Sequence, residues 1–172
     1  MATSTQIILD GVERIRETTG SVVEGLGESE LEARLDPEAN TISWLVWHLA
    51  RVQDAQVADV AGSEQVWTTG DWVGRFALPF SPRATGYGHS PDDVGSVTGL
   101  TAELLLGYLE AVSDRTAEYV GSLSDADLDR IVDERWDPPV TLSARLVSIL
   151  SDDLQHAGQA AFIRGILERR AS

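Results

Sequence analysis

Apolar residues recur along much of this chain at steps of three and four, the spacing of one face of an α-helix. The pattern predicts four long helices, over residues 4–26, 42–62, 100–123 and 141–167. Either Asn40 or Thr41 is suited to cap the start of the second helix. The run Trp136–Pro139 contains two prolines and cannot continue a helix, so it separates the last helix from the third.

The helical pattern stops between residues 63 and 99. In this stretch glycines and prolines interrupt five aromatic residues, Trp67, Trp72, Phe76, Phe80 and Tyr87. A connection of this length is uncommon in a compact domain unless it crosses the fold or covers a functional site. We therefore expect an all-α four-helix bundle, one domain over residues 1–172, with a long aromatic-rich crossover between the second and third helices that forms a pocket wall.

The amino-acid composition excludes some classes of binding partner. The 172 residues include 28 acidic and 13 basic side chains, and the resulting net charge of -15 opposes binding to nucleic acid or to an anionic membrane. The chain has no cysteine, so any thiol in its chemistry must arrive with a substrate. No signal-peptide pattern and no run of ~20 apolar residues is present, which predicts a cytoplasmic protein. An exposed apolar helix face would permit a homodimer.

Two of the three histidines lie in strongly apolar predicted helices. His48 is central in the second, and His156 follows an acidic residue by one helical turn in the last. Residues four apart share a helix face, about 5–6 Å apart at Cβ, so they can chelate one ion. A single histidine of this kind more often bonds a carbonyl at the core edge. The joint occurrence favours a metal site with three protein ligands and an open position, as in catalytic zinc centres.

Helical spacing alone does not decide which acidic residue is the third ligand. Asp152 stands four residues before His156 and Asp153 three, and both positions reach the same helix face. A helical wheel places Asp153 nearer the apolar centre and Asp152 at its margin, which favours Asp153. The other aspartate is then a surface acid or an acceptor that orients a histidine.

Three further side chains are candidate substrate contacts. Arg51, one turn beyond His48, is suited to binding a substrate carboxylate or to pairing with one of the many acids. Trp44 is typical of core or pocket lining, and Gln159 is a polar group one turn past His156. His89 lies in a glycine-containing loop, where we expect a solvated histidine that does not bind the metal.

Two segments carry a family resemblance. The sequences NTISWLVWHLAR, residues 40–51, and QHAGQAAFIRG, residues 155–165, resemble the DinB-like superfamily, and the order of the four helices extends the likeness over nearly the whole chain. The resemblance implies a bundle that binds a divalent metal through one histidine of the second helix and two ligands four residues apart on the last. This maps onto His48, Asp152 and His156. The acid at the earlier position looks like the carboxylate ligand of mycothiol-dependent maleylpyruvate isomerases, so the resemblance selects Asp152.

The same resemblance implies thiol chemistry. The chain looks most similar to mycothiol S-transferases, which implies a divalent metal such as Zn²⁺, mycothiol as co-substrate and an electrophile as acceptor, as in detoxification. In this interpretation the metal lowers the pKa of the thiol. Two alternatives keep the same site but change the reaction, to thiol-dependent isomerisation or to hydrolysis. A third is a non-catalytic stress-response or binding protein.

Overall fold

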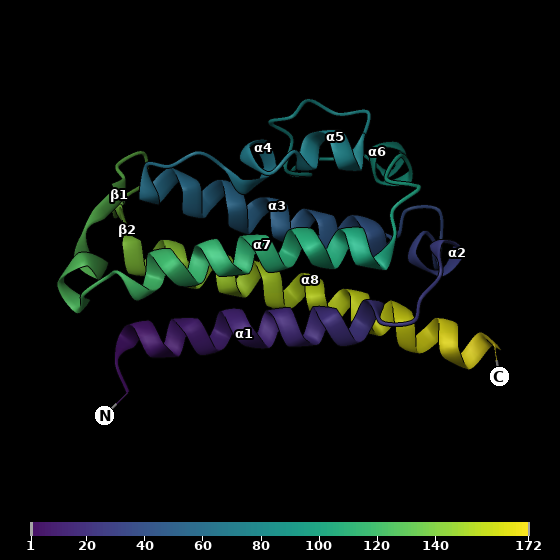
Figure 1. The fold of residues 1–172 in the computed structure, drawn as a ribbon, viewed down its shortest axis with the longest axis horizontal. Helices are drawn as coiled ribbons and strands as arrows, with labels where there is room; N and C mark the ends of the chain where they lie inside the picture. Colours follow the sequence, from purple (N-terminus) through teal and green to yellow (C-terminus); the bar gives the residue numbers. More distant parts are fainter. Residues whose placement is uncertain (1, 172) are drawn as a thin grey trace.

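Four long helices dominate the structure, a computed structural model that describes residues 2–171 (Figure 1). The helices and strands are α1 (Ser4–Val23), α2 (Glu28–Leu31), α3 (Ile42–Ala61), α4 (Val66–Thr69), α5 (Trp72–Phe76), α6 (Pro91–Gly95), α7 (Ala102–Gly121), the 3₁₀-helix η1 (Asp125–Asp129), β1 (Ile131–Asp133), β2 (Val140–Thr141) and α8 (Leu142–Ala171). The expectation of a mostly helical protein is therefore confirmed. None of the described helices combines the length and the apolar character needed to cross a membrane.

Local capping explains where the long helices begin. The side chains of Thr3, Thr41 and Thr101 each accept a hydrogen bond from the backbone N–H three residues further on, at the starts of α1, α3 and α7. Gly62 ends α3 with a φ of 64°, the left-handed conformation that glycine adopts without strain. Helix α1 ends at Val23, three residues before the predicted end.

The long helices pack side by side. Helix α3 contacts both α7 and α8, and α1 contacts the same two helices. Figure 1 shows α1 and α8 running in one direction and α3 and α7 in the other. Two consecutive long helices, α3 and α7, can be parallel because the chain between them returns along the molecule before α7 begins (Figure 1). This return is the long crossover that the sequence predicts.

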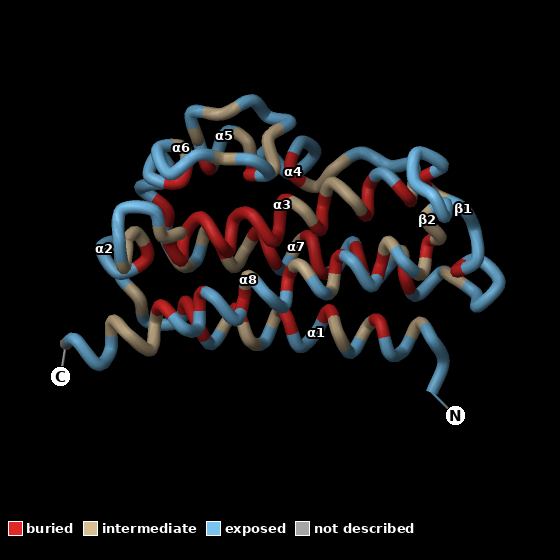
Figure 2. The backbone as a smooth tube through the Cα atoms, turned by 180° about the vertical axis from the view of Figure 1, so that it is seen from behind, coloured by how far each residue is buried: buried red, intermediate tan, exposed pale blue. Residues whose placement is uncertain are grey.

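The crossover contains more structure than its sequence indicates. Helices α4, α5 and α6 divide it, and its side chains Trp67, Trp72 and Phe76 are buried in the main hydrophobic cluster together with Tyr108 of α7. Residues 42–51 of α3 are all buried as a result, because α7 and α8 cover one side of the helix and the crossover covers the other (Figure 2).

A small antiparallel hairpin, β1 with β2, lies between η1 and α8, where the sequence predicts only a break in the helix. The prolines that prevent helix formation occupy its turn. The hairpin ends where Thr141 caps the first turn of α8, since its hydroxyl accepts a hydrogen bond from the backbone N–H of Ala144. Helix α8 then runs for 30 residues, about 45 Å at the rise of an α-helix, and supplies two of the candidate ligands.

Candidate metal centre

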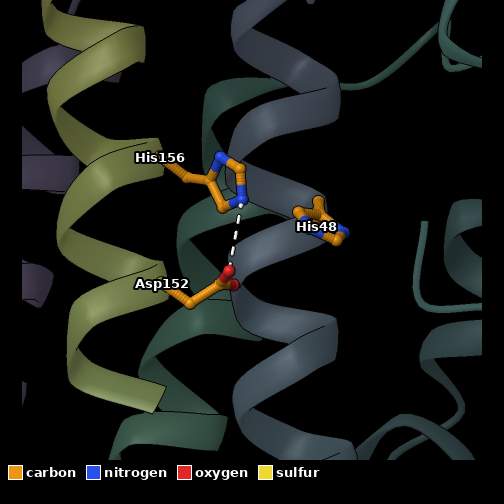
Figure 3. Close-up of side chains that lie close together, drawn as sticks. All are labelled: His48, Asp152 and His156. Atoms are coloured by element: carbon orange, nitrogen blue, oxygen red, sulfur yellow. Dashed lines mark ion pairs between the residues drawn. The ribbon is translucent and has the colours of Figure 1, made fainter. Parts of the chain in front are cut away.

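The structure brings His48, Asp152 and His156 together from helices that are adjacent in space but distant in sequence. One candidate ligand atom from each residue lies within 4.8 Å of the others. The His156 ring and the Asp152 carboxylate project from α8 toward His48 on α3 (Figure 3), and His156 Nε2 lies 3.6 Å from Asp152 Oδ1. The spacing of four residues on α8 therefore produces the shared face that helical geometry requires.

His48 is held tightly. Its side chain is buried, its ring stacks on Trp44 at 4.5 Å between centroids, and its Nδ1 lies 2.6 Å from the carbonyl oxygen of Thr85. A carbonyl only accepts hydrogen bonds, so Nδ1 carries the proton and Nε2 keeps the lone pair that a metal needs. The carbonyl bond expected of an ordinary core histidine and the metal-ligand role are thus compatible in this residue.

Burial lowers the pKa of His48 below the ordinary histidine value. The hydrogen bond to Thr85 acts in the opposite direction, and the neighbouring His156 lowers the pKa further. Desolvation is the largest of these effects, so the neutral imidazole is the favoured form at neutral pH. A metal requires that form of a histidine ligand.

His156 is less constrained. Its Nδ1 makes a long hydrogen bond, 3.4 Å, to Oε1 of Gln159, and 17% of its side chain is exposed. Gln159, a predicted substrate contact, is hydrogen-bonded to this candidate ligand, where it favours the same tautomer as in His48.

The two adjacent aspartates have opposite environments. Asp152 is 38% exposed in its side chain and lies beside both histidines, and its Oδ2 is a buried atom without a hydrogen-bond partner. Asp153 is fully buried, and neither carboxylate oxygen has a hydrogen-bond partner among the described residues. Burial raises the pKa of Asp153 well above the usual carboxyl range, and the charge of Asp152 adds to this.

The helical wheel therefore predicts which aspartate is buried, but the buried one is not the one beside the histidines. The resemblance selects Asp152, the residue that the structure places in the triad. Asp153 is then the other aspartate, for which the sequence allows an orienting role, and in this structure its carboxylate makes no hydrogen bond to either histidine. At 100° per residue Asp153 projects farther into the core than its neighbour, so it misses the margin where the ligands meet.

Arg51 adopts the second of its two predicted roles, pairing with an acid. It is completely buried and therefore does not bind a substrate carboxylate in this structure. Its guanidinium donates hydrogen bonds to Tyr108, to Gln65 and to Asp54, with which it forms a buried ion pair. The sequence leaves both roles open because it does not show that the crossover covers this face of α3.

His89 is not the solvated loop residue that its sequence context predicts. Its Nδ1 accepts a hydrogen bond from Trp44 Nε1, and its ring stacks on Trp47 at 5.8 Å. It lies outside the triad, as expected. Trp44 therefore contacts three histidines, since its ring also stacks on His48 and lies perpendicular to the ring of His156. Trp44 belongs to the main hydrophobic core, the first of the two roles predicted for it.

A cavity of about 330 Å³ opens beside His48 and Asp152. The residues that line it besides these two are Val52, Ala55, Gln56, Thr85 and Tyr87. Sequence reasoning did not single out Gln56 or Thr85, because neither residue type nor spacing marks a cavity wall. Tyr87 is 92% exposed, which places an aromatic ring in solvent at the cavity. The alternation of Gly86, Tyr87 and Gly88 was the available signal for a tight turn here.

The donor set suits a divalent metal. Two imidazole nitrogens with free lone pairs and one carboxylate oxygen converge, and the unpartnered Oδ2 of Asp152 is a polar atom that a cation would satisfy. Three protein ligands leave a coordination position open, and the adjacent cavity gives a small molecule access to it.

Comparison with known proteins identifies the family and the fold. The sequence pattern of the DinB superfamily matches residues 12–160. The chain belongs to the DinB superfamily. A solved structure described as a conserved protein from Enterococcus faecalis shares the fold with a TM-score of 0.89 at 29% sequence identity, and the match covers 95% of this chain and 96% of that one. No curated protein matches the sequence. DinB proteins often bind metals, and the triad is the corresponding candidate site in this member.

Proposed function

We propose that this DinB protein is a metal-dependent transferase that conjugates a low-molecular-weight thiol, with mycothiol as the first candidate, to an electrophilic substrate. The convergence of His48, Asp152 and His156 beside an accessible cavity carries the proposal. The chain has no cysteine, so a co-substrate must supply the sulfur. The likeness of the acidic ligand position to mycothiol-dependent enzymes supports the choice of thiol.

Three residues would bind the metal, and the adjacent cavity would admit the substrate. One ring nitrogen of each histidine and a carboxylate oxygen of Asp152 would hold the ion, for which zinc fits the mixed nitrogen and oxygen donors. When bound, the metal lowers the pKa of a coordinated thiol so that the thiolate predominates near neutral pH. The cavity beside His48 and Asp152 holds the electrophile. The thiol proton would leave to solvent, and sulfur would then bond to the electrophilic carbon. In a displacement the leaving group departs with the electron pair of its bond to that carbon. In an addition the electron pair of the carbon–carbon double bond takes up a proton from solvent.

The test is product analysis by mass spectrometry. Metal-replete protein is incubated with mycothiol and a panel of electrophiles, alongside reactions that lack protein or metal. We expect an adduct whose mass is that of mycothiol plus the electrophile, less any leaving group, only when both protein and metal are present. No adduct in protein that holds one metal per chain would contradict the proposed transfer reaction.

Two adjacent substitutions provide a matched control. Asp152→Asn removes a ligand charge and should abolish both metal retention and adduct formation. Asp153→Asn alters the neighbouring carboxylate, which makes no hydrogen bond to the triad in this structure, and should retain both. If Asp153→Asn lost the metal while Asp152→Asn kept it, the ligand assignment would be wrong.

The open position beside the cavity also admits water, which favours metal-dependent hydrolysis as the second candidate. Hydrolysis should proceed without added thiol. Thiol-dependent isomerisation would require thiol but leave none attached to the product. The same mass spectra therefore distinguish all three reactions. Protein that is purified without metal and is not stabilised by added Zn²⁺ would instead favour a non-catalytic binding role.

A further inference from the structure

The crossover segment Ala84–Gly86 lies directly against the buried candidate ligand His48. Two consecutive carbonyl groups in this segment bond to α3: Ala84 accepts from Arg51 Nε at 3.2 Å and Thr85 accepts from His48 Nδ1 at 2.6 Å. His48 and Arg51 are three residues apart and share a helix face. One face of α3 therefore holds the backbone of the segment at two neighbouring points.

Hydrogen bonds and an ion pair hold the Arg51 guanidinium in place. Its Nη1 donates to Tyr108 and its Nη2 to Gln65, at 3.1 and 3.0 Å. Asp54, its ion-pair partner, also accepts hydrogen bonds from the backbone N–H groups of Val66 and Trp67 in α4. The network ties α3, α4 and α7 together at a fully buried guanidinium, so the Ala84 carbonyl has a rigid partner.

Gly86 allows the segment to approach this closely. Its φ is +94°, and a Cβ atom at this position would lie 2.6 Å from His48 Nδ1, 3.1 Å from the Trp47 ring and 3.2 Å from the Trp44 ring. A side chain would therefore separate the segment from His48. Gly88, two residues on, also has a positive φ, +75°, but a Cβ there would meet no atom within 4 Å. The two glycines share a backbone requirement and differ in their contact with the site.

We propose that Arg51 and Gly86 are positioning residues that hold the Thr85 carbonyl against His48 and thereby keep Nε2 of His48 unprotonated for metal binding. The inference rests on the proposed metal-binding role of the triad. Neither residue touches the metal or a substrate. Both act through the hydrogen bond to Nδ1, which selects the tautomer and orients the ring.

The decisive pair of variants is Gly86→Ala and Gly88→Ala. Loss of a group that orients a metal ligand typically weakens metal binding by 10–100-fold, so we expect Gly86→Ala to weaken Co²⁺ binding by at least about tenfold. Gly88→Ala also places an alanine at a positive φ, but without a clash at His48. It should therefore bind Co²⁺ within about twofold of the parent. Titration of Co²⁺ absorption bands measures both affinity and ligand geometry.

A second measurement needs no metal. In the ¹⁵N NMR spectrum of metal-free protein labelled at histidine, His48 should be the Nδ1–H tautomer in the parent and in Gly88→Ala. In Gly86→Ala it should become a mixture of tautomers. Arg51→Lys, which keeps the charge beside Asp54 but loses the planar fork of donors, should shift the His48 tautomer in the same direction.

Unchanged Co²⁺ affinity and an unchanged His48 tautomer in Gly86→Ala would overturn the inference, as would an equal loss of affinity in Gly88→Ala. If the parent protein bound no Co²⁺ or Zn²⁺, the proposed metal function would fail. The tautomer comparison would still decide whether Arg51 and Gly86 control His48.

Discussion

The two helices that form the candidate site hold their ligands in different ways. On α3, His48 is 6% exposed, stacked on Trp44 and bonded to a backbone carbonyl at 2.6 Å. On α8, the side chains of Asp152 and His156 are 38% and 17% exposed, and one long hydrogen bond to Gln159 supports His156. The α3 ligand is fixed by tertiary contacts, whereas the α8 pair depends mainly on helical spacing.

The difference shows how two packed helices can combine a rigid ligand and an adaptable pair of ligands in one site. A buried, oriented imidazole reduces the entropy lost when a metal binds. A pair of ligands on an exposed helix face can adjust to the ion and to a substrate entering the adjacent cavity. We therefore expect substitutions around His48 to lower both the stability of the fold and the affinity for metal. Substitutions around His156 should chiefly lower the affinity for metal.

The largest effect on stability should come from Arg51→Met, which leaves Asp54 buried without its cationic partner. Breaking a buried ion pair costs about 3–5 kcal/mol of unfolding free energy. Arg115 and Glu118 form an ion pair with the same i,i+3 spacing on the surface, at 48% and 76% side-chain exposure. Arg115→Met should cost less than about 1 kcal/mol. Urea unfolding of both variants measures the contrast, and equal losses would contradict the structural role of Arg51.

The next largest effect should come from removing a histidine ligand. His48→Ala and His156→Ala should each weaken Zn²⁺ binding by more than the roughly 100-fold that loss of an orienting partner can cost. His48→Ala should also lower the melting temperature of the metal-free protein more than His156→Ala, because it removes a buried, stacked ring. Calorimetric titration and thermal unfolding provide the two readouts.

His89→Ala is the matched control for those variants, since His89 contacts Trp44 but lies outside the triad. It should retain Zn²⁺. A loss as large as in His156→Ala would place His89 among the ligands and break the proposed division between the two helices.

Asp153→Leu should stabilise the protein at neutral pH by roughly 1–3 kcal/mol, the usual cost of a buried polar group without a partner. The folded-state pKa of Asp153 is raised, so the folded state binds more protons than the unfolded state between the ordinary carboxyl pKa and the raised value. Stability from this group is therefore lost as pH rises through that window. Unfolding free energies of parent and variant measured from pH 4 to pH 8 should diverge with rising pH. Parallel curves would contradict the assigned burial.

The smallest effect should be that of Gln159→Ala. The hydrogen bond from His156 is long and partly solvated, so its loss should cost about 0.5 kcal/mol, roughly a twofold change in Zn²⁺ affinity. A tenfold loss would show that the α8 ligands are oriented as firmly as His48. Glutamine at this position would then be an essential support for the site.

Local chemistry was enough to predict much of the architecture. Apolar steps of three and four residues predicted the long helices, and α3 begins directly after its predicted cap and ends one residue before its predicted end. The i,i+4 relation of Asp152 and His156 also follows from one helix alone. Helical geometry repeats from turn to turn, so these features need no knowledge of neighbouring elements.

Contacts across the chain decided the rest. Whether Arg51 meets a substrate or a buried acid depends on the crossover that covers it, and the support of His48 by Thr85 joins residues 37 apart in sequence. The helical wheel correctly identified Asp153 as the buried aspartate but also favoured it as the ligand. The periodicity of one helix indicates which side chains are buried. It does not indicate where a ligand on another helix lies. The path of the backbone between helices brings these groups together, and periodicity within a helix carries no information about that path.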